Sequence, residues 1–194
     1  MQGLFVPDGM SIRAIESGIL LTLLCCPAYA QTSTSVKTAT AQPEMARLAQ
    51  ALAGDWNNVE VMEPSGEYPH GAQRRGTSHC ELSTGGVTLI CRGSSDGSAG
   101  QLDHLVVMWW DTETKLYGFF ICFRDRDSGC EIRGTAHWDG KDLVNDYKEN
   151  VNGKQTKMRD SWIDITPRSH TLIAAMEMPD GSMKPLITTR STKR

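Results

Sequence analysis

The sequence has little of three things: charge of one sign, long apolar runs, and clusters of chemically reactive residues. Its 194 residues include 20 basic and 23 acidic side chains, a formal net charge of −3. No basic field is therefore present to attract nucleic acid or an anionic membrane surface. The longest apolar stretch, residues 19–26, is too short to span a bilayer as a helix. These absences exclude nucleic acid as a partner and a membrane-spanning helix.

Motifs for catalysis, metal binding and phosphate binding are also missing. The Gly-x-Ser-x-Gly run at residues 93–97 is not followed by the helix that the sharp turn of a hydrolase needs. No close pair of cysteines in the domain and no pair of histidines has metal-ligand spacing. The loop around Gly97 and Gly100 is not followed by the strand-to-helix transition of a phosphate-binding loop. The sequence therefore predicts no cofactor, no metal and no catalytic constellation.

The first thirty residues have the pattern of a cleaved signal peptide. Arg13 precedes the apolar stretch, and Ala28-Tyr29-Ala30 before Gln31 has the small-x-small form of a cleavage site. A lipoprotein leader, which Cys25 and Cys26 suggest, is the alternative, although neither follows the small residue that lipidation needs. The start of translation is left open between Met1 and Met10, although residues 10–13 have more of the pattern of a normal n-region than the preceding residues. Residues 1–30 therefore predict export, to a periplasmic or secreted location.

The rest of the chain divides into a linker and one domain. Residues 31–42 are rich in threonine, serine and alanine, which is typical of a flexible linker. Residues 43–194 have the length of a single domain. The four cysteines of this domain predict disulfides in an exported protein. Three pairings are possible, and hairpin symmetry about residues 85–86 and about Arg126 favours these two bridges: Cys80–Cys91 and Cys122–Cys130.

The domain opens with one short helix and continues in strands. Pro43 at the first position, with Met45, Leu48 and Leu52 spaced on one face, predicts a helix over 43–53 that ends at a left-handed Gly54. Alternating or β-branched runs follow, separated by short turns such as Asp139-Gly140 and Asp180-Gly181. The expected strands are 55–63, 73–82, 87–94, 101–110, 115–123, 130–137, 142–149, 155–166, 170–178 and 183–192.

Short connections between successive strands favour an all-β, up-and-down antiparallel β-barrel. About ten strands of this length close on themselves and leave no exposed edge. The alternative closed form is an outer-membrane barrel. The sequence argues against it, because residues 154–160 carry charges on both faces and no lipid-facing apolar band is present. The expected fold is a closed, lipocalin-like barrel with one N-terminal helix.

Three short motifs carry a family resemblance. Residues 52–56 (LAGDW), 110–117 (WDTETKLY) and 178–181 (MPDG) resemble, in order and spacing, a family of small bacterial exported domains, the domain-of-unknown-function family fifteen seventy-nine. The resemblance covers the chain from about Met45 to its end. It implies a lipocalin-like (calycin-like) barrel and no established activity. The four cysteines are not part of this pattern.

A more distant likeness is to nitrobindin-type barrels, which bind haem iron through a histidine on the last strands. Residues 183–192 contain no histidine, and His170 is expected at the turn before the preceding strand. This departure argues against haem but leaves other apolar ligands open.

Trp56 is expected to close one end of the barrel from the inside, because a large ring there buries much apolar area. In lipocalin-like barrels a basic side chain of the closing strand covers the ring of the Gly-x-Trp motif. The resemblance assigns this part to Arg190, with Lys193 as the second choice.

The function that the sequence favours is an exported binding module for a small apolar molecule. The candidate cavity residues are His79, His104, Trp109, Tyr117, Phe119, Trp162 and Met176. Because Trp109 and Trp110 face opposite sides of a strand, one ring is expected outside, under the helix 43–53. One alternative is an enzyme that uses His79, His104 or Glu81 for proton transfer. The other is a structural protein with a filled core. The sequence leaves the oligomeric state open.

Overall fold

The computed structural model describes residues 42–83, 85–124, 130, 132–151 and 153–194. The expected leader and all of the linker except Gln42 lie outside these residues. One helix, α1 (Pro43–Leu52), precedes ten strands. The strands are β1 (Gly54–Met62), β2 (Ala72–Leu82), β3 (Thr88–Gly97), β4 (Leu102–Asp111), β5 (Leu116–Phe123), β6 (Ile132–Asp139), β7 (Asp142–Val151), β8 (Lys154–Ile163), β9 (Ser169–Glu177) and β10 (Met183–Lys193).

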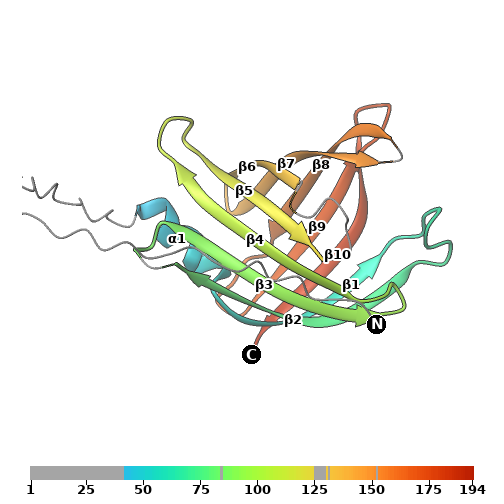
Figure 1. Cartoon of the computed structure of the whole chain (residues 1–194), viewed down its shortest axis with the longest axis horizontal. Coiled ribbons are helices and arrows are strands. Elements are labelled where there is room, and N and C mark those ends of the chain that lie inside the picture. The colour runs from blue at the N-terminus through green and yellow to red at the C-terminus, as the bar shows by residue number, and fades with distance from the viewer. Residues whose placement is uncertain (1–41, 84, 125–129, 131, 152) are drawn as a thin grey trace, which may run out of the picture. The chain divides into compact units, whose positions relative to one another are not determined.

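Each strand pairs antiparallel with the next, and β10 pairs with β1 to close the barrel (Figure 1). The closing register sets Trp56 opposite Lys193 and Met62 opposite Ile187. The predicted closed meander is confirmed, and closure leaves no unpaired strand edge. In the described part of the chain, no helix is long and apolar enough to cross a membrane.

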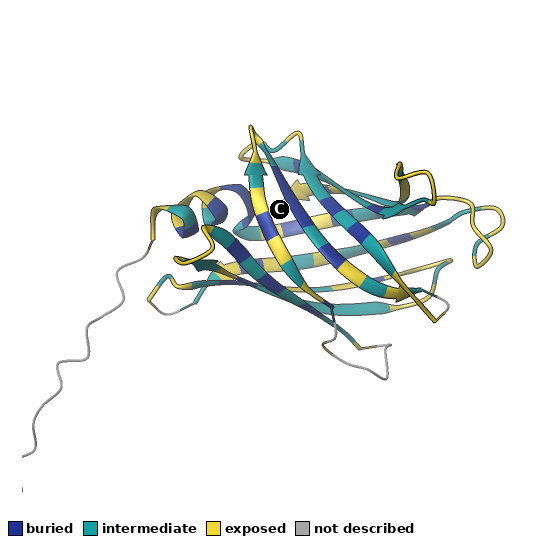
Figure 2. Cartoon of the chain, turned by 90° about the horizontal axis from the view of Figure 1, so that it is seen from above, coloured by how far each residue is buried: buried dark blue, intermediate teal, exposed yellow. Residues whose placement is uncertain are grey.

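The side chains alternate between the inner and outer faces of the barrel. In β1 the inward residues Trp56, Asn58, Glu60 and Met62 are all buried. Figure 2 shows the same alternation as bands along other strands. Because paired residues share a face of the sheet, this register identifies the inward positions on every neighbouring strand.

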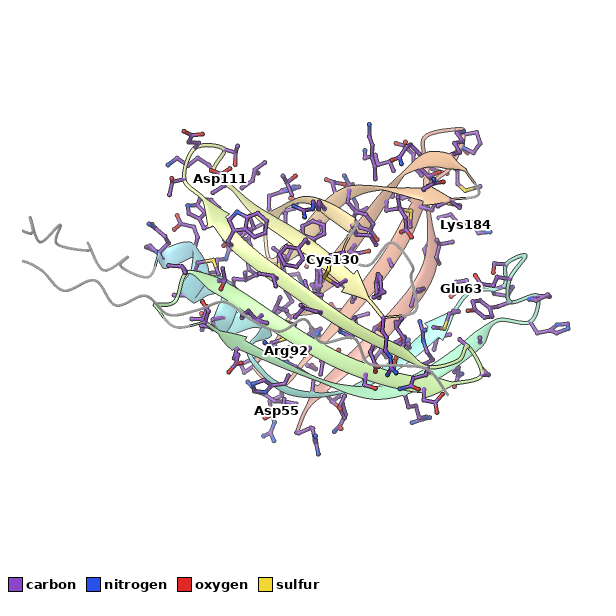
Figure 3. All side chains as sticks on the ribbon, viewed as in Figure 1. Asp55, Glu63, Arg92, Asp111, Cys130 and Lys184 are labelled. Atoms are coloured by element: carbon purple, nitrogen blue, oxygen red, sulfur yellow. A yellow bond between two sulfur atoms is a disulfide. The ribbon has the colours of Figure 1, made fainter. Side chains whose placement is uncertain are left out.

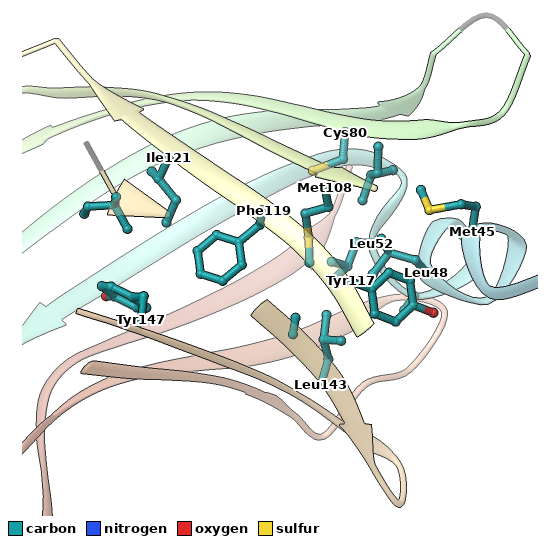
Figure 4. Close-up of a cluster of buried hydrophobic side chains, with 14 of the residues drawn as sticks. Met45, Leu48, Leu52, Cys80, Met108, Tyr117, Phe119, Ile121, Leu143 and Tyr147 are labelled. Atoms are coloured by element: carbon teal, nitrogen blue, oxygen red, sulfur yellow. The ribbon is translucent and has the colours of Figure 1, made fainter. Parts of the chain in front are cut away.

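Helix α1 covers one end of the barrel (Figures 1 and 2). Its apolar face joins the barrel core through Met45, Leu48 and Leu52, which are almost fully buried (Figure 4). The Trp56 indole donates a hydrogen bond to the carbonyl of Leu52 at 2.8 Å, and the Tyr117 hydroxyl donates to the carbonyl of Glu44 at 2.8 Å. Apolar burial and paired polar atoms thus hold the helix on the barrel.

The helix ends differently from the expectation. Ala53 takes the C-cap in an extended conformation, and Gly54 already belongs to β1, with a φ of +131° instead of the left-handed value near +60°. A Cβ on Gly54 would lie 2.6 Å from Cε of Lys193. The Lys193 side chain passes over this glycine and donates to the carbonyl of Ala53 at 3.1 Å. Gly54 is therefore required both for its φ and for the approach of Lys193.

Both predicted disulfides are confirmed: Cys80–Cys91 and Cys122–Cys130. Cys80 and Cys91 lie directly opposite each other on β2 and β3. Their hairpin turn is longer than the two residues expected, because β2 ends at Leu82 and β3 begins at Thr88. The turn around Arg126, expected between the second pair, lies outside the described residues.

Candidate functional site

The barrel interior contains five of the seven cavity candidates. The registers of β4, β5, β8 and β9 place on the inner face His104, Tyr117, Phe119, Trp162 and Met176. The Tyr117 hydroxyl donates to the carbonyl of Glu44 on the helix and accepts a hydrogen bond from the Trp138 indole at 3.1 Å. Phe119 is fully buried against Tyr147, with a ring separation of 5.9 Å.

His79 lies outside the barrel, which corrects the expectation. Its Nδ1 is 2.8 Å from a carboxylate oxygen of Asp55, and its side chain is half exposed. The hydrogen bond to Asp55 raises the pKa of His79. Glu81 lies beside it on the same outer face. The enzyme hypothesis placed a histidine–carboxylate pair in the cavity, and this pair does not lie there.

Trp109 also lies outside, and the helix does not cover it. Its indole packs over Gly118, where a Cβ would overlap the ring. It also lies 6.3 Å from the ring of Phe120. Neighbours on β5 therefore shield this tryptophan, while α1 covers the end of the barrel. The helix was the wrong partner because the period-2 pattern assigns a face of the sheet but not what packs on that face.

Trp56 occupies the expected place, 1% exposed at the helix-covered end. Its cationic neighbour is Lys193, whose Nζ lies 5.3 Å from the ring centroid. Arg190 pairs with Val59 and is exposed, so the choice of Arg190 was wrong. The register explains the difference: Lys193 lies directly opposite Trp56 and on the same face.

The ring of His170 packs against the Trp56 indole, edge to face at 4.5 Å. His170 belongs to β9 and is buried; it does not lie in the turn expected from the sequence. Burial lowers its pKa to about 4, so the imidazole is neutral at physiological pH. The interior positions of β10 hold Ile187, Thr189, Ser191 and Lys193, so none of them supplies a histidine.

A polar wall on β1 to β4 lines one side of the interior. The guanidinium Nε of Arg74 donates to a carboxylate oxygen of Glu60 at 2.9 Å, and both side chains are buried. The Asn58 amide donates to the hydroxyl of Ser78 at 3.0 Å. His104 lies over Gly93, where a Cβ would overlap its ring, and burial lowers its pKa.

A second polar group lies on β7 and β8. Asn145 and Asp160 are paired across the two strands and buried. The Tyr147 hydroxyl donates to Asp160 at 3.2 Å. Burial raises the pKa of Asp160 to about 7, against the opposite effect of the Tyr147 hydrogen bond.

Four of the inward polar residues have buried side-chain atoms without a hydrogen-bond partner in the described structure. These atoms are Asn58 Oδ1, Ser95 Oγ, His170 Nδ1, and both Oδ1 and Nδ2 of Asn145. Buried polar atoms in proteins are nearly always paired with protein, water or ligand. The interior therefore combines an apolar lining with hydrogen-bonding positions that the described protein atoms do not fill.

The sequence analysis missed this polar lining, although a signal for it exists. Asn58 and Glu60 lie two and four residues after Trp56 and before Met62. The period of two in a strand therefore places them on the same face as the buried indole. In the same way Asn145 alternates with apolar inward residues of β7. A search for polar residues in phase with buried aromatic residues would have found them.

A groove of about 660 Å³ is lined by residues of β1 to β5, most of them on the outer face but with His104 and Phe123 from the inner face. Asp55 and Arg92, labelled in Figure 3, line it. Two of its arginines pair with carboxylates: Arg124 with Asp103 at 2.9 Å and Arg92 with Glu81 at 3.4 Å. Among the described residues, no group of three or more histidine, cysteine, aspartate or glutamate side chains could hold a metal ion.

The fold and its interior define a small, closed, antiparallel β-barrel protein. The crystal structure of Rv2717c from M. tuberculosis is similar, with a TM-score of 0.54 and 11% identity, over 79% of this chain and 99% of that chain. At this identity the likeness shows the fold alone.

Two designed barrels bound to DFHBI were also found. The redesigned barrel mFAP0 has a TM-score of 0.40 and 14% identity over 74% of this chain, and EF1p2_mFAP2b has a TM-score of 0.41 and 14% identity over 77%. Each comparison covers 99% of the designed chain. No family model and no curated protein matches this sequence. The family resemblance thus has no support beyond the barrel fold that it implied.

Proposed function

We propose that this protein is a binding module that holds a small, mainly apolar molecule inside its barrel. The observation that carries the proposal is the partial exposure of side chains on the inner face, among them Leu172, Ala174, Ile187 and Thr189. A completely filled interior would bury them. Barrels of eight strands already hold one small ligand in some families, and diameter grows with strand number.

The interior also supports a ligand that is not purely apolar. Phe119, Met158 and Met176 supply adaptable apolar surface. The unpaired polar atoms of Asn58 and Asn145 supply hydrogen-bonding positions. Pockets for small molecules typically combine such a lining with a few polar groups that fix orientation. We therefore propose a ligand with an apolar body and at least one hydrogen-bonding group.

We further propose that the protein acts outside the cytoplasm. Two disulfides are typical of proteins folded in an oxidising compartment. The signal-peptide pattern of residues 1–30 supports the same location. Size-resolved detection of the protein in periplasmic and culture fractions tests it: a full-length, cytoplasmic product would contradict export.

The binding proposal is tested by blocking the interior. Ala174 faces inward, opposite Asp160 and Ile187, so Ala174→Trp fills the space beside them. The matched control is Ile173→Trp, the next position on the outer face of β9. Natively purified protein is extracted, and the small molecules that accompany it are identified by mass spectrometry. A molecule bound by the parent and the control but lost from Ala174→Trp is expected. Equal recovery from all three proteins would contradict an interior site.

A further inference from the structure

Asn145 and Asp160 form an isolated polar pair on an otherwise apolar part of the inner face. Asn145 is 0% exposed, and neither its amide oxygen nor its amide nitrogen has a partner among the described residues. Asp160 is 5% exposed and accepts the hydrogen bond from Tyr147. Leu143, two residues before Asn145 on the same face, is fully buried. The frame around this carboxamide thus offers it little hydrogen bonding.

Small side chains flank the pair. The register sets Ala136 of β6 opposite Asn145, and Ala174 of β9 opposite Asp160. The row across four strands is therefore alanine, asparagine, aspartate, alanine. Ala136 is fully buried, whereas Ala174 is partly exposed, so the accessible surface beside the polar pair lies at Ala174.

The chemistry of a carboxamide narrows the ligand class. Asn145 presents a donor and an acceptor side by side, and the matching edge has an acceptor beside a donor. A carboxamide or a lactam has this edge. An ammonium group offers donors only, and an ester offers acceptors only, so each leaves one atom of Asn145 unpaired. The raised pKa of Asp160, about 7, lets its carboxyl group donate or accept near neutral pH.

We propose that Asn145 and Asp160 bind the carboxamide or lactam group of the ligand, whose apolar body lies along the barrel interior. This inference rests on the proposed binding function and names the chemical class that the interior selects. It also gives this buried polar residue a use: a leucine of similar size would satisfy the apolar frame but could not recognise such a group.

The test uses probes of equal chain length and different head groups. Octanamide, methyl octanoate and octylammonium are titrated into the full-length protein by calorimetry. Octanamide is expected to bind about tenfold more tightly than methyl octanoate, as one well-made buried hydrogen-bonding edge allows. In Asn145→Leu this preference is expected to disappear, with methyl octanoate binding within about threefold of the parent.

Two further variants control the result. Asn150→Leu changes the same residue type on the exposed outer face of β7 and is expected to keep the preference for the amide. Asn145→Ala removes the carboxamide without adding bulk and gives the same readout if leucine prevents folding. Asn145→Leu is also expected to unfold at the same temperature as the parent or at a higher one, because it removes a buried amide without a partner.

The outcomes separate the two proposals. Equal affinities of the parent for octanamide and methyl octanoate would overturn this inference, since water would then serve the atoms of Asn145, and would leave the binding function standing. Tighter binding of octylammonium would overturn it in favour of a cation site at Asp160. The binding function itself would be overturned by two results together. None of the three probes would bind, and Ala174→Trp would yield the same co-purified molecules as the parent.

Discussion

The helix-covered end of the barrel and the middle of its interior are both buried, yet they differ in how their polar atoms are paired. At the covered end, the Trp56 and Trp138 indoles and the Tyr117 hydroxyl all donate hydrogen bonds to protein acceptors. In the middle, the carboxamide of Asn145 and one atom of Asn58 have no partner among the described residues. His170 Nδ1, beside Trp56, is the exception at the covered end; paired polar atoms are otherwise typical of a region that stabilises a fold.

The contrast assigns different roles to the two regions. The covered end joins α1 to the barrel and gains stability from large buried side chains such as Trp56 and Leu48. The middle keeps polar groups that cost stability while unpaired, which is the usual trade-off at a binding site. Substitutions in the first region should therefore mainly change folding, and those in the second should mainly change binding.

The largest expected effect is that of Trp56→Ala. Removing a fully buried indole should lower the free energy of unfolding by about 3–5 kcal/mol, because it also removes the hydrogen bond to Leu52 and the contact with His170. Urea unfolding measures the difference. The control is Trp109→Ala on the outer face, expected to cost less than half as much. An unchanged urea midpoint for Trp56→Ala would contradict the stabilising role assigned to the helix-covered end.

The next effect concerns pH and the buried groups of the interior. Burial holds the pKa of folded Asp160 near 7, against 3.8 as the reference, so its contribution to stability is complete below pH 3.8 and lost as pH rises through 7. Burial holds the pKa of folded His170 near 4, against 6.5, so its contribution is complete above pH 6.5 and lost as pH falls through 4. Between pH 4 and pH 6.5 the two contributions oppose each other.

In single variants, the free energy of unfolding should therefore depend on pH in a way that the two opposing contributions cancel in the parent. Relative to the parent, the free energy of unfolding of Asp160→Asn should rise with pH between 4.5 and 6.5, and that of His170→Gln should fall. Each change of slope is at most about 1.4 kcal/mol per pH unit, the value for one proton. Urea titrations at three pH values measure it. Parallel curves for all three proteins would mean that neither group is held in its unusual state.

The smallest effect distinguishes the two basic residues of β10. Lys193→Met removes the cation near the Trp56 ring and the hydrogen bond to Ala53, and it should cost about 0.5–1 kcal/mol because the site is exposed. Arg190→Met should leave stability unchanged, since Arg190 lies on the outer face. Chemical unfolding of both variants decides between them, and a larger cost for Arg190→Met would reverse the assignment.

Local patterns were enough to predict most of the fold. The helix was predicted to within one residue, and each of the ten strands begins within two residues of its predicted start. Turn residues and alternation are properties of a few neighbouring positions, so they can be read without the fold. The disulfides followed because Cys80 and Cys91, like Cys122 and Cys130, are joined by a single hairpin each.

Two of the predictions that were wrong depend on contacts between distant parts of the chain. The choice of Arg190 over Lys193 required the register between β1 and β10, which lie at opposite ends of the domain. The place of His170 beside Trp56 required the same closure. The residue pattern of a single strand does not determine its register with a strand that is distant in the sequence.

The sequence by itself determined that this chain forms a closed antiparallel barrel with one helix, because periodicity and turns act over short distances. Only the tertiary structure decided which side chains meet inside. It brought Asn145 of β7 beside Asp160 of β8 and enclosed both in an apolar frame. The cost and the use of a polar group depend on its surroundings. Those surroundings come from four neighbouring strands, β6 to β9, so they exist only once the sheet has formed.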